Sequence, residues 1–136
     1  MDDISTAMQV AASGMRAQST RIRVVAENIA NANSAAEAPG LDPYRRQTPV
    51  FSSFLDRDTN AHMVEVSRVA LDPSAFTLQF DPSHPAADEE GYVKLPNVNP
   101  LVEMMDLREA QRSYEANLGA LDTMRSMAAS TLRILE

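Results

Sequence analysis

Several residue types are missing or scarce in this chain, and each shortage excludes a kind of site. None of the 136 residues is a cysteine, which excludes disulfides, thiol nucleophiles and thiolate metal sites. Four glycines leave little for a backbone cradle around phosphate, and no G-x-S-x-G or H-E-x-x-H motif is present. No apolar run approaches the ~18 residues of a membrane-spanning helix. We therefore expect a protein that is not an enzyme and that does not insert into a membrane.

Positive charge is also scarce. The formal net charge of −7 argues against a nucleic-acid partner and against binding to anionic membrane surfaces. The acidic excess lies mainly in the middle, because residues 31–100 carry ten acids and five bases while residues 1–30 carry three of each. The start, Met1-Asp2-Asp3-Ile4, is acidic and lacks a continuous apolar segment, so we expect no cleaved secretion signal.

Proline is confined to the middle of the chain. All eight prolines lie between Pro39 and Pro100, so the run from Leu101 to Glu136 is uninterrupted. Asn99 is a favourable N-cap, because its side-chain oxygen can accept hydrogen bonds from the free N–H groups of a first helical turn. Pro100 suits the first helical position, where a missing N–H has no consequence. This pattern predicts one long helix from Leu101 to Glu136.

Both ends of the chain carry apolar residues every seven positions, the pattern of a coiled coil. The N-terminal helix is predicted from residue 3 to about residue 31, and the asparagines within residues 28–33 are expected to end it. The periodicity alone fits a helix used for assembly and the core helix of an isolated hairpin equally well. The candidate assembly interface consists of the repeating rows, namely Met8, Met15, Ile22, Ile29, Leu107, Tyr114, Leu118, Leu121, Leu132 and Leu135.

Short strands are expected between the two helices. Alternating apolar and polar residues predict strands at 76–80 and 63–71, with weaker patterns at 49–55 and 92–95. The predicted fold class is therefore mainly α with a small β-rich insertion, in which the two long terminal helices form a coiled-coil-like pair. The expected segments are an N-terminal helix (1–33), a β-rich or irregular middle (34–100) and a C-terminal helix (101–136).

Two groups of polar residues in the middle segment are candidate sites. One group combines residue types that bind divalent metals, namely Asp81, His84 and Asp88, with His62 as a fourth member. Neighbouring prolines frame this group as a turn, so we interpret it as structural and expect neither a metal nor a cofactor. The other group is the basic pair Arg45-Arg46, which either meets an acidic neighbour or is solvated. An isolated basic pair is usually solvated.

A series of short sequence blocks carries a family resemblance. The N-terminal blocks are Ala12-Ser13-Gly14-Met15-Arg16-Ala17-Gln18 and Asn28-Ile29-Ala30-Asn31-Ala32-Asn33-Ser34. The later blocks are Pro43-Tyr44-Arg45-Arg46, Asp81-Pro82-Ser83-His84-Pro85-Ala86-Ala87-Asp88, Gly91-Tyr92-Val93, Pro96-Asn97-Val98-Asn99, Glu103-Met104-Met105-Asp106 and Tyr114-Glu115-Ala116-Asn117. Over nearly the whole chain, this order of blocks resembles the rod and hook family of the bacterial flagellum, in particular its proximal rod proteins. Ser34 replaces the family's usual threonine, and residues 35–42 lengthen the following loop.

The resemblance implies a structural subunit of the proximal rod, the drive shaft of the flagellum. It implies that the terminal helices pair in the inner tube of the rod and that the middle segment lies outside that tube. The implied partners are copies of the same chain, other rod subunits and the flagellar type III export apparatus. The implied location is the basal body, in the rod that crosses the periplasm, reached without a cleaved signal peptide.

The segment Phe51-Ser52-Ser53-Phe54-Leu55 resembles the short export element of early rod and hook substrates, in which Phe51 and Leu55 are the key residues. The favoured alternative is a strand that buries Phe51 and Leu55 on one face. Two other functions remain open for the whole chain. One is a soluble helical-hairpin adaptor that binds a partner helix, and a more distant one is a metal-dependent enzyme built on His84.

Overall fold

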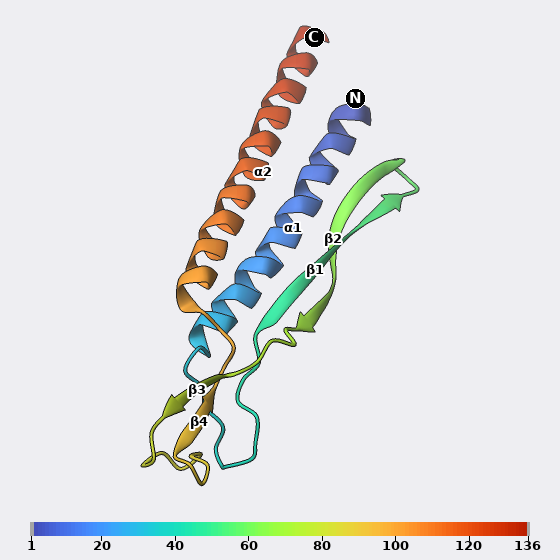
Figure 1. Ribbon diagram of the computed structural model, residues 1–136. Coiled ribbons are helices and arrows are strands. Elements are labelled where there is room, and N and C mark those ends of the chain that lie inside the picture. The colour runs from blue at the N-terminus through green and yellow to red at the C-terminus, as the bar shows by residue number, and fades with distance from the viewer. Residues whose placement is uncertain (1, 136) are drawn as a thin grey trace. The chain divides into compact units, whose positions relative to one another are not determined.

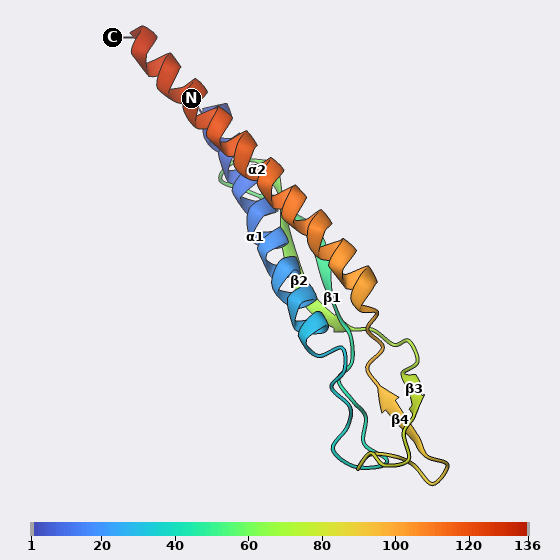
Figure 2. The ribbon, with the colours of Figure 1, turned by 90° about the vertical axis from the view of Figure 1, so that its left-hand side faces the viewer.

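Two long helices and four strands make up the fold. The computed structural model describes the backbone of residues 2–135 and the side chains of residues 3–134. The elements are α1 (Asp2–Ala30), β1 (Gln47–Asp56), β2 (Ala61–Leu71), β3 (Thr77–Phe80), β4 (Tyr92–Leu95) and α2 (Pro100–Leu135). Figures 1 and 2 show these helices and the two strand pairs from two directions. The predicted fold class, mainly α with a small β-rich insertion between terminal helices, is confirmed.

The described chain forms two compact units, and each combines segments that are far apart in sequence. Unit 1 draws on Met1–Ile22, Pro49–Arg68 and Arg108–Glu136. Unit 2 draws on Arg23–Thr48 and Val69–Leu107. Each of the two helices therefore contributes one part to unit 1 and another part to unit 2.

The first turn of α2 has the predicted cap. The side-chain oxygen of Asn99 accepts hydrogen bonds from the N–H groups of Leu101 and Val102, at 3.1 and 3.5 Å. Pro100 opens the helix, and Glu103 N–H donates to the Asn99 carbonyl at 3.0 Å. The two bonds to the Asn99 side chain satisfy donors that would otherwise be free at a helix start.

The end of α1 corrects one expectation. The helix ends at Ala30, where Asn31 caps it by donating its side-chain amide to the Glu27 carbonyl at 2.9 Å. Asn28, which we expected to help end the helix, lies inside it and is fully buried. Its side chain makes tertiary hydrogen bonds instead of competing for the helix backbone, and a buried amide with such partners does not disrupt a helix.

Unit 1 is packed around small residues of α1. The buried residues there include Ala11, Ser13 and Ala17, and Ala110 of α2 is also buried. A Cβ added at Gly14 would lie 3.0 Å from the amide nitrogen of Asn117, so the glycine allows the side chain of α2 to come close. Arg21 and Glu109 form an ion pair between the two helices at 3.8 Å.

Strands β1 and β2 pair in a two-stranded sheet and run in opposite directions (Figure 1). The carboxylate of Asp56 shapes their turn by accepting hydrogen bonds from the N–H groups of Asp58 and Thr59, at 2.9 and 3.0 Å. Asn60 adopts the left-handed conformation with φ 52°, which asparagine tolerates better than most residues. In β2, the N–H of Val64 donates to the Ser13 hydroxyl at 3.3 Å, which joins the sheet to α1 within unit 1.

The predicted strand at Phe51–Leu55 exists, but the expected burial of its apolar face is wrong. Phe51 is 40% exposed and Leu55 is 48% exposed. A two-stranded sheet provides no second layer of its own, and in β2 it is Met63 that is buried. Phe51 and Leu55 therefore remain available on the surface of the described chain.

In unit 2, strands β3 and β4 form an antiparallel pair with Phe80 opposite Tyr92. Their rings meet edge to face with centroids 5.4 Å apart. Gly91 has φ +86°, and a Cβ there would lie 2.9 Å from the Phe80 ring. The position therefore requires glycine both for its backbone conformation and for space. Leu78, Phe80 and Tyr92 are nevertheless exposed.

Candidate functional site

The helix α2 exposes apolar side chains along its length while burying a narrow stripe. Glu103 and Ala110 are fully buried, and the half-buried positions that follow on the same face include Tyr114, Leu121 and Ala128. A helix that is apolar on more than one face needs more than one partner. The large exposed apolar residues in the described part of α2 are Leu101, Val102, Met104, Met105, Leu118, Met127, Leu132 and Ile134.

The residues predicted for the assembly interface differ in burial. Half-buried positions are Met8, Met15, Ile22, Ile29, Leu107, Tyr114 and Leu121. Leu118 and Leu132 are exposed, at 41% and 50%. The side chain of Leu135 lies outside the described part of the chain. In α1 the deepest burial belongs to neighbouring positions such as Val24 and Val25, so the predicted row stands at the margin of the packed face.

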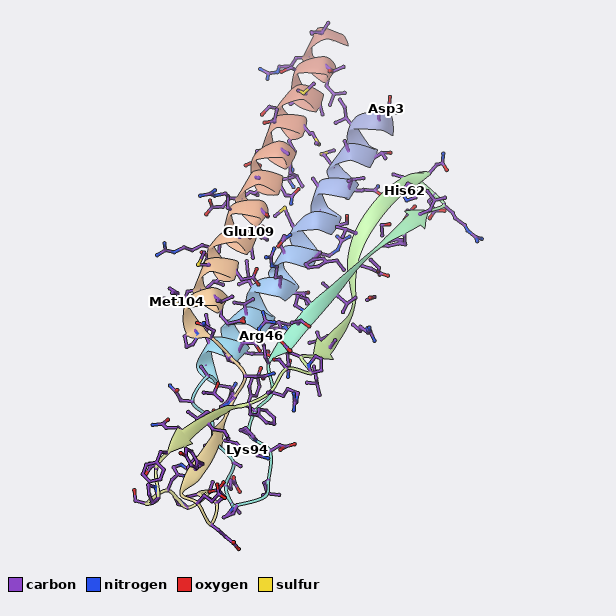
Figure 3. The ribbon with its side chains drawn as sticks, in the orientation of Figure 1. Asp3, Arg46, His62, Lys94, Met104 and Glu109 are labelled. Atoms are coloured by element: carbon purple, nitrogen blue, oxygen red, sulfur yellow. The ribbon has the colours of Figure 1, made fainter. Side chains whose placement is uncertain are left out.

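The first two turns of α2 carry an exposed apolar cluster whose members are absent from the predicted assembly interface. Leu101, Met104 and Met105 are 68%, 51% and 65% exposed, and Figure 3 shows Met104 pointing outward from the helix. The signal in the sequence is the methionine pair directly after Glu103. Methionine adapts to irregular partner surfaces because its side chain is unbranched and polarisable.

Within unit 1, α1 and α2 border an open groove with a volume of about 390 Å³. Three of the predicted interface residues from α2 line it, together with Met15 of α1. Its complete lining is Ala12, Met15, Arg16, Ser19, Tyr114, Leu118, Leu121 and Arg125. The structure therefore brings together four of the predicted residues at one apolar groove flanked by two arginines.

Within unit 2, Asn28 is the centre of a buried polar network. Its amide nitrogen donates to the Gln47 carbonyl at 2.7 Å and to a Glu103 carboxylate oxygen at 3.1 Å. Its side-chain oxygen accepts from the Tyr44 hydroxyl at 2.8 Å and from Gln47 N–H at 2.9 Å. With all four bonds made, the buried amide is fully satisfied.

Arg46 forms the charged part of this network, which corrects the expectation that the Arg45-Arg46 pair is solvated. The guanidinium bonds the buried carboxylate of Glu103 and also pairs with Asp72 at 3.3 Å. Figure 3 labels Arg46 at the start of β1. The Glu103 side chain is 1% exposed, so its charge is balanced by a partner rather than by water.

Arg45 and Asn97 also belong to this network. The Arg45 guanidinium donates to the carbonyls of Asp72 and Ser74, at 2.8 and 3.0 Å, and stacks 4.2 Å from the Phe76 ring centre. The Asn97 amide donates to the same two carbonyls, at 3.1 and 3.2 Å. Its oxygen accepts from Arg46 N–H at 2.8 Å. The sequence blocks around Asn28, Tyr44, Asn97 and Glu103 thus meet in one place.

The protonation of the network follows from these contacts. Burial, followed by the negative charges of Glu27 and Glu103, raises the pKa of Tyr44. Burial opposes the charge of Arg46, but the bonds and charges of Glu103 and Asp72 outweigh it and raise the pKa of Arg46. Hydrogen bonds from Ser74, assisted by Arg46, lower the pKa of Asp72. The network therefore favours a charged Arg46, an ionised Asp72 and a neutral Tyr44.

Three of the residues considered for a metal site, Asp81, His84 and Asp88, bind their own loop, whereas the fourth, His62, is exposed in β2. Asp81 accepts hydrogen bonds from the Ser83 hydroxyl at 2.6 Å and from its N–H at 3.2 Å, which lowers the pKa of Asp81. His84 accepts from Ala86 N–H through Nδ1 at 3.0 Å, and Asp88 accepts from Tyr92 N–H at 2.8 Å. Within residues 3–134, no three His, Cys, Asp or Glu side chains are grouped to hold a metal. These bonds agree with the interpretation of the group as a turn.

The described chain offers apolar contact surfaces and a polar network within unit 2. The described residues combine exposed apolar side chains, an open groove and a polar network whose members are bonded to one another. In the described helices, the combination of length and apolar character that a bilayer crossing requires does not occur. Exposed apolar side chains beside an open groove suit a protein that binds other protein surfaces.

Comparison with known proteins gives matches at both ends of the chain. Residues 8–35 match the family model described as flagella basal body rod protein. Residues 89–134 match the model described as flagellar basal body rod FlgEFG protein C-terminal. The two matched segments contain α1 from Met8 onward and almost all of α2.

Full-length relatives give the same result. The flagellar basal-body rod protein FlgC of Agrobacterium fabrum is 49% identical over 136 residues, which cover 100% of this chain and 98% of the relative. FlgC of Aquifex aeolicus is 40% identical over 131 residues, 96% of each chain. FlgC of Borreliella burgdorferi is 37% identical over 149 residues, covering 96% of this chain and 97% of the relative. The chain therefore belongs to the family of flagellar basal-body rod proteins that includes those named FlgC.

Proposed function

We propose that this chain is a structural subunit of the proximal part of the flagellar rod and that it polymerises through its terminal helices. The observation that carries the proposal is the set of apolar side chains exposed along α2, from Leu101 to Ile134. Exposed apolar surface of this extent marks a contact with another protein. Family membership supports the rod as the structure in which that contact is made.

The interface proposed on this basis keeps the two heptad rows. In α1 it comprises Met8, Met15, Ile22 and Ile29, and in α2 it comprises Leu107, Tyr114, Leu118, Leu121, Leu132 and Leu135. Half-burial of most of these side chains supports the idea that each chain covers them incompletely and a neighbour covers the rest. We add Leu101, Met104 and Met105 to this interface, because their side chains are more exposed than the described side chains of the two heptad rows.

Each of the three segments of the sequence is proposed to occupy its own place in the rod. Residues 1–33 and 101–136 form the inner tube of the rod, and residues 34–100 lie outside it. The subunit catalyses no reaction and holds no cofactor or metal. It binds copies of itself and other rod subunits, in the part of the basal body that crosses the periplasm. A contact that does not close on itself generates a filament, which suits this role.

Before assembly, the chain is proposed to pass through the flagellar type III export apparatus without cleavage of a signal peptide. Phe51 and Leu55 form the element that the apparatus reads. Their exposure on β1 supports this role, because both side chains are accessible without unfolding the hairpin.

Substitution of an exposed α2 residue tests the rod proposal. Leu132→Asp places a charge where a neighbour is expected, and burying an unpaired charge costs several kcal/mol. The variant should be synthesised and exported, yet be absent from purified basal bodies and leave cells immotile. Ser130→Asp adds the same charge at an exposed polar position of the same helix and should be incorporated.

Two results would contradict the proposal. Equal incorporation of both variants would show that the apolar row of α2 is not an interface. Absence of the unsubstituted chain from purified basal bodies, together with a compact monodisperse dimer in solution, would favour the soluble adaptor.

A further inference from the structure

We infer that the hairpin of β3 and β4 in one copy docks into the groove between α1 and α2 of a second copy. This inference rests on the proposed function, because it names the contact by which copies of the subunit bind each other. We call residues 77–95 the acidic hairpin, and the groove lined by Arg16 and Arg125 the arginine groove.

The arginine groove is apolar at its base and positive at its margins. Met15, Leu118 and Leu121 supply the apolar lining, and the two lining charges, Arg16 and Arg125, are both basic and exposed. No acid is among the eight residues that line it. A volume of about 390 Å³ lies within the ~300–1,000 Å³ range of pockets that bury organic groups, so it accommodates an aromatic side chain.

The acidic hairpin has the complementary character. Leu78 and Phe80 are 61% and 62% exposed. Its acids are Asp81, Asp88, Glu89 and Glu90, and its one lysine or arginine is Lys94. Lys94 pairs with Asp42 at 3.7 Å, so the loop between the strands presents mainly negative charge. Apolar side chains surrounded by acids match an apolar groove flanked by arginines.

Other exposed apolar surfaces of the described chain match the groove less well. Phe54 and Leu55 stand near Arg57 as well as Asp58, so that hairpin has mixed charge. Met105, in the first turns of α2, is followed by both Asp106 and Arg108. Arginines at the groove therefore favour the acidic hairpin over these two alternatives.

The contact has a consequence for assembly. The groove belongs entirely to unit 1 and the hairpin entirely to unit 2, so each copy carries one of each. A contact between two different surfaces leaves a free groove on one copy and a free hairpin on the other. Further copies can then add in the same way, as a filament requires.

A photo-crosslinking residue at Phe80 tests the contact in assembled basal bodies. Phe80→p-benzoylphenylalanine keeps an aromatic ring at the position and bonds covalently to whatever lies beside it under ultraviolet light. We expect a covalent dimer of this chain, with the crosslinked peptides containing residues 12–19 or 114–125. The same photo-residue at Phe54 serves as the control and should give different peptides. The reverse experiment at Leu118 should capture peptides from residues 77–95.

Charge reversal tests the electrostatic part of the inference. Arg16→Glu with Arg125→Glu places like charges together and should lower the dimer yield from position 80 roughly threefold or more. Adding Glu89→Arg and Glu90→Arg restores opposite charges and should restore the yield. Arg112→Glu, at an exposed α2 position outside the groove lining, should leave the yield unchanged.

The outcomes separate this inference from the proposed function. If the chain is present in basal bodies but crosslinks from positions 80 and 118 reach another protein, or form no product, the docking inference is overturned while the rod role stands. An unchanged yield after charge reversal would also overturn it. If the unsubstituted chain is absent from basal bodies, the proposed function itself fails.

Discussion

At Asn28, a single side chain joins three segments that are distant in sequence. Its four hydrogen bonds reach Tyr44, Gln47 and Glu103, and every polar atom of the amide is satisfied. Buried polar groups of this kind are costly when half-satisfied and specific when complete. The network therefore selects one arrangement of the segments in unit 2, rather than adding a large net stability.

Removal of the buried carboxylate should destabilise unit 2. Glu103→Ala leaves Arg46 with Asp72 as its remaining acidic partner and leaves the Asn28 amide short of one acceptor. We expect the free energy of unfolding to fall by about 1–3 kcal/mol, because losing the carboxylate leaves buried polar groups without a hydrogen-bond partner. Urea denaturation of the purified chain measures this change.

Glu109→Ala is the matched control on the same helix. The Glu109 side chain is 71% exposed and its ion pair with Arg21 is 3.8 Å long. Such pairs contribute roughly 0–1 kcal/mol, so this variant should stay close to the parent. If Glu103→Ala and Glu109→Ala destabilise the chain equally, the buried network contributes no more to stability than an exposed ion pair.

Tyr44 should make the stability of unit 2 sensitive to alkaline pH. Its pKa is raised above the usual value of 10.0, so the folded chain holds the phenolic proton more tightly than the unfolded chain does. The linked stability is fully present below the unfolded pKa, near 10, and is lost as the pH rises through the folded pKa.

Comparison with Tyr44→Phe isolates this effect, because Tyr92 and Tyr114 remain in both proteins. The variant lacks the hydroxyl that donates to Asn28, so it should be less stable at neutral pH. The stability difference should shrink as the pH rises from about 10 upward. A difference that stays constant over this range would contradict a proton held by the network.

At the scale of elements, each long helix has two unequal parts. In unit 2, residues 23–30 of α1 and 100–107 of α2 are joined through the buried bond between Asn28 and Glu103. In unit 1, the rest of each helix packs through small residues and leaves the arginine groove open. Isolated helices are marginal without packing, so the two parts should differ in stability.

Hydrogen exchange on the dilute, purified chain should reveal this difference. We expect slower exchange of amides in residues 23–30 and 100–107 than in residues 3–22 and 108–134. In the proposed rod, neighbouring subunits would supply the missing contacts, and assembly would couple folding to binding. Uniform strong protection along both helices would instead indicate a hairpin that is complete as a monomer.

For the whole molecule, the proposed export route requires that the chain be recognised before it assembles. Phe51 and Leu55 are exposed on β1, so replacing both with alanine should remove a recognition surface while sparing the fold. We expect export to drop roughly tenfold, the loss that ~1.4 kcal/mol of binding energy produces. Secretion of the chain from growing cells measures the effect.

Phe54→Ala is the control for this experiment, since Phe54 is 38% exposed on the same strand but is not one of the two key residues of the export element. It should be exported like the parent. Equal losses from the two variants would point to general destabilisation of the hairpin rather than to recognition.

Local sequence patterns were enough to predict the helices, the strands and the family. Local rules were sufficient for α2, because the cap at Asn99, the proline at position 100 and the absence of later prolines act within a few residues. Alternation was sufficient for the strand predicted at 76–80, which the structure gives as Thr77–Phe80. The family followed from ordered sequence blocks, and the relatives confirm it.

The contacts made by the polar residues of those blocks depend on the folded chain and could not be predicted from local patterns. Asn28 looked like a helix terminator and Arg46 like a solvated cation, because sequence spacing does not reveal which side chains meet across 75 or 57 positions. Burial of Phe51 was also expected wrongly, since alternation predicts a strand but not whether a second layer covers it. Long-range contacts set burial and charge pairing, and these depend on the whole fold rather than on neighbouring residues.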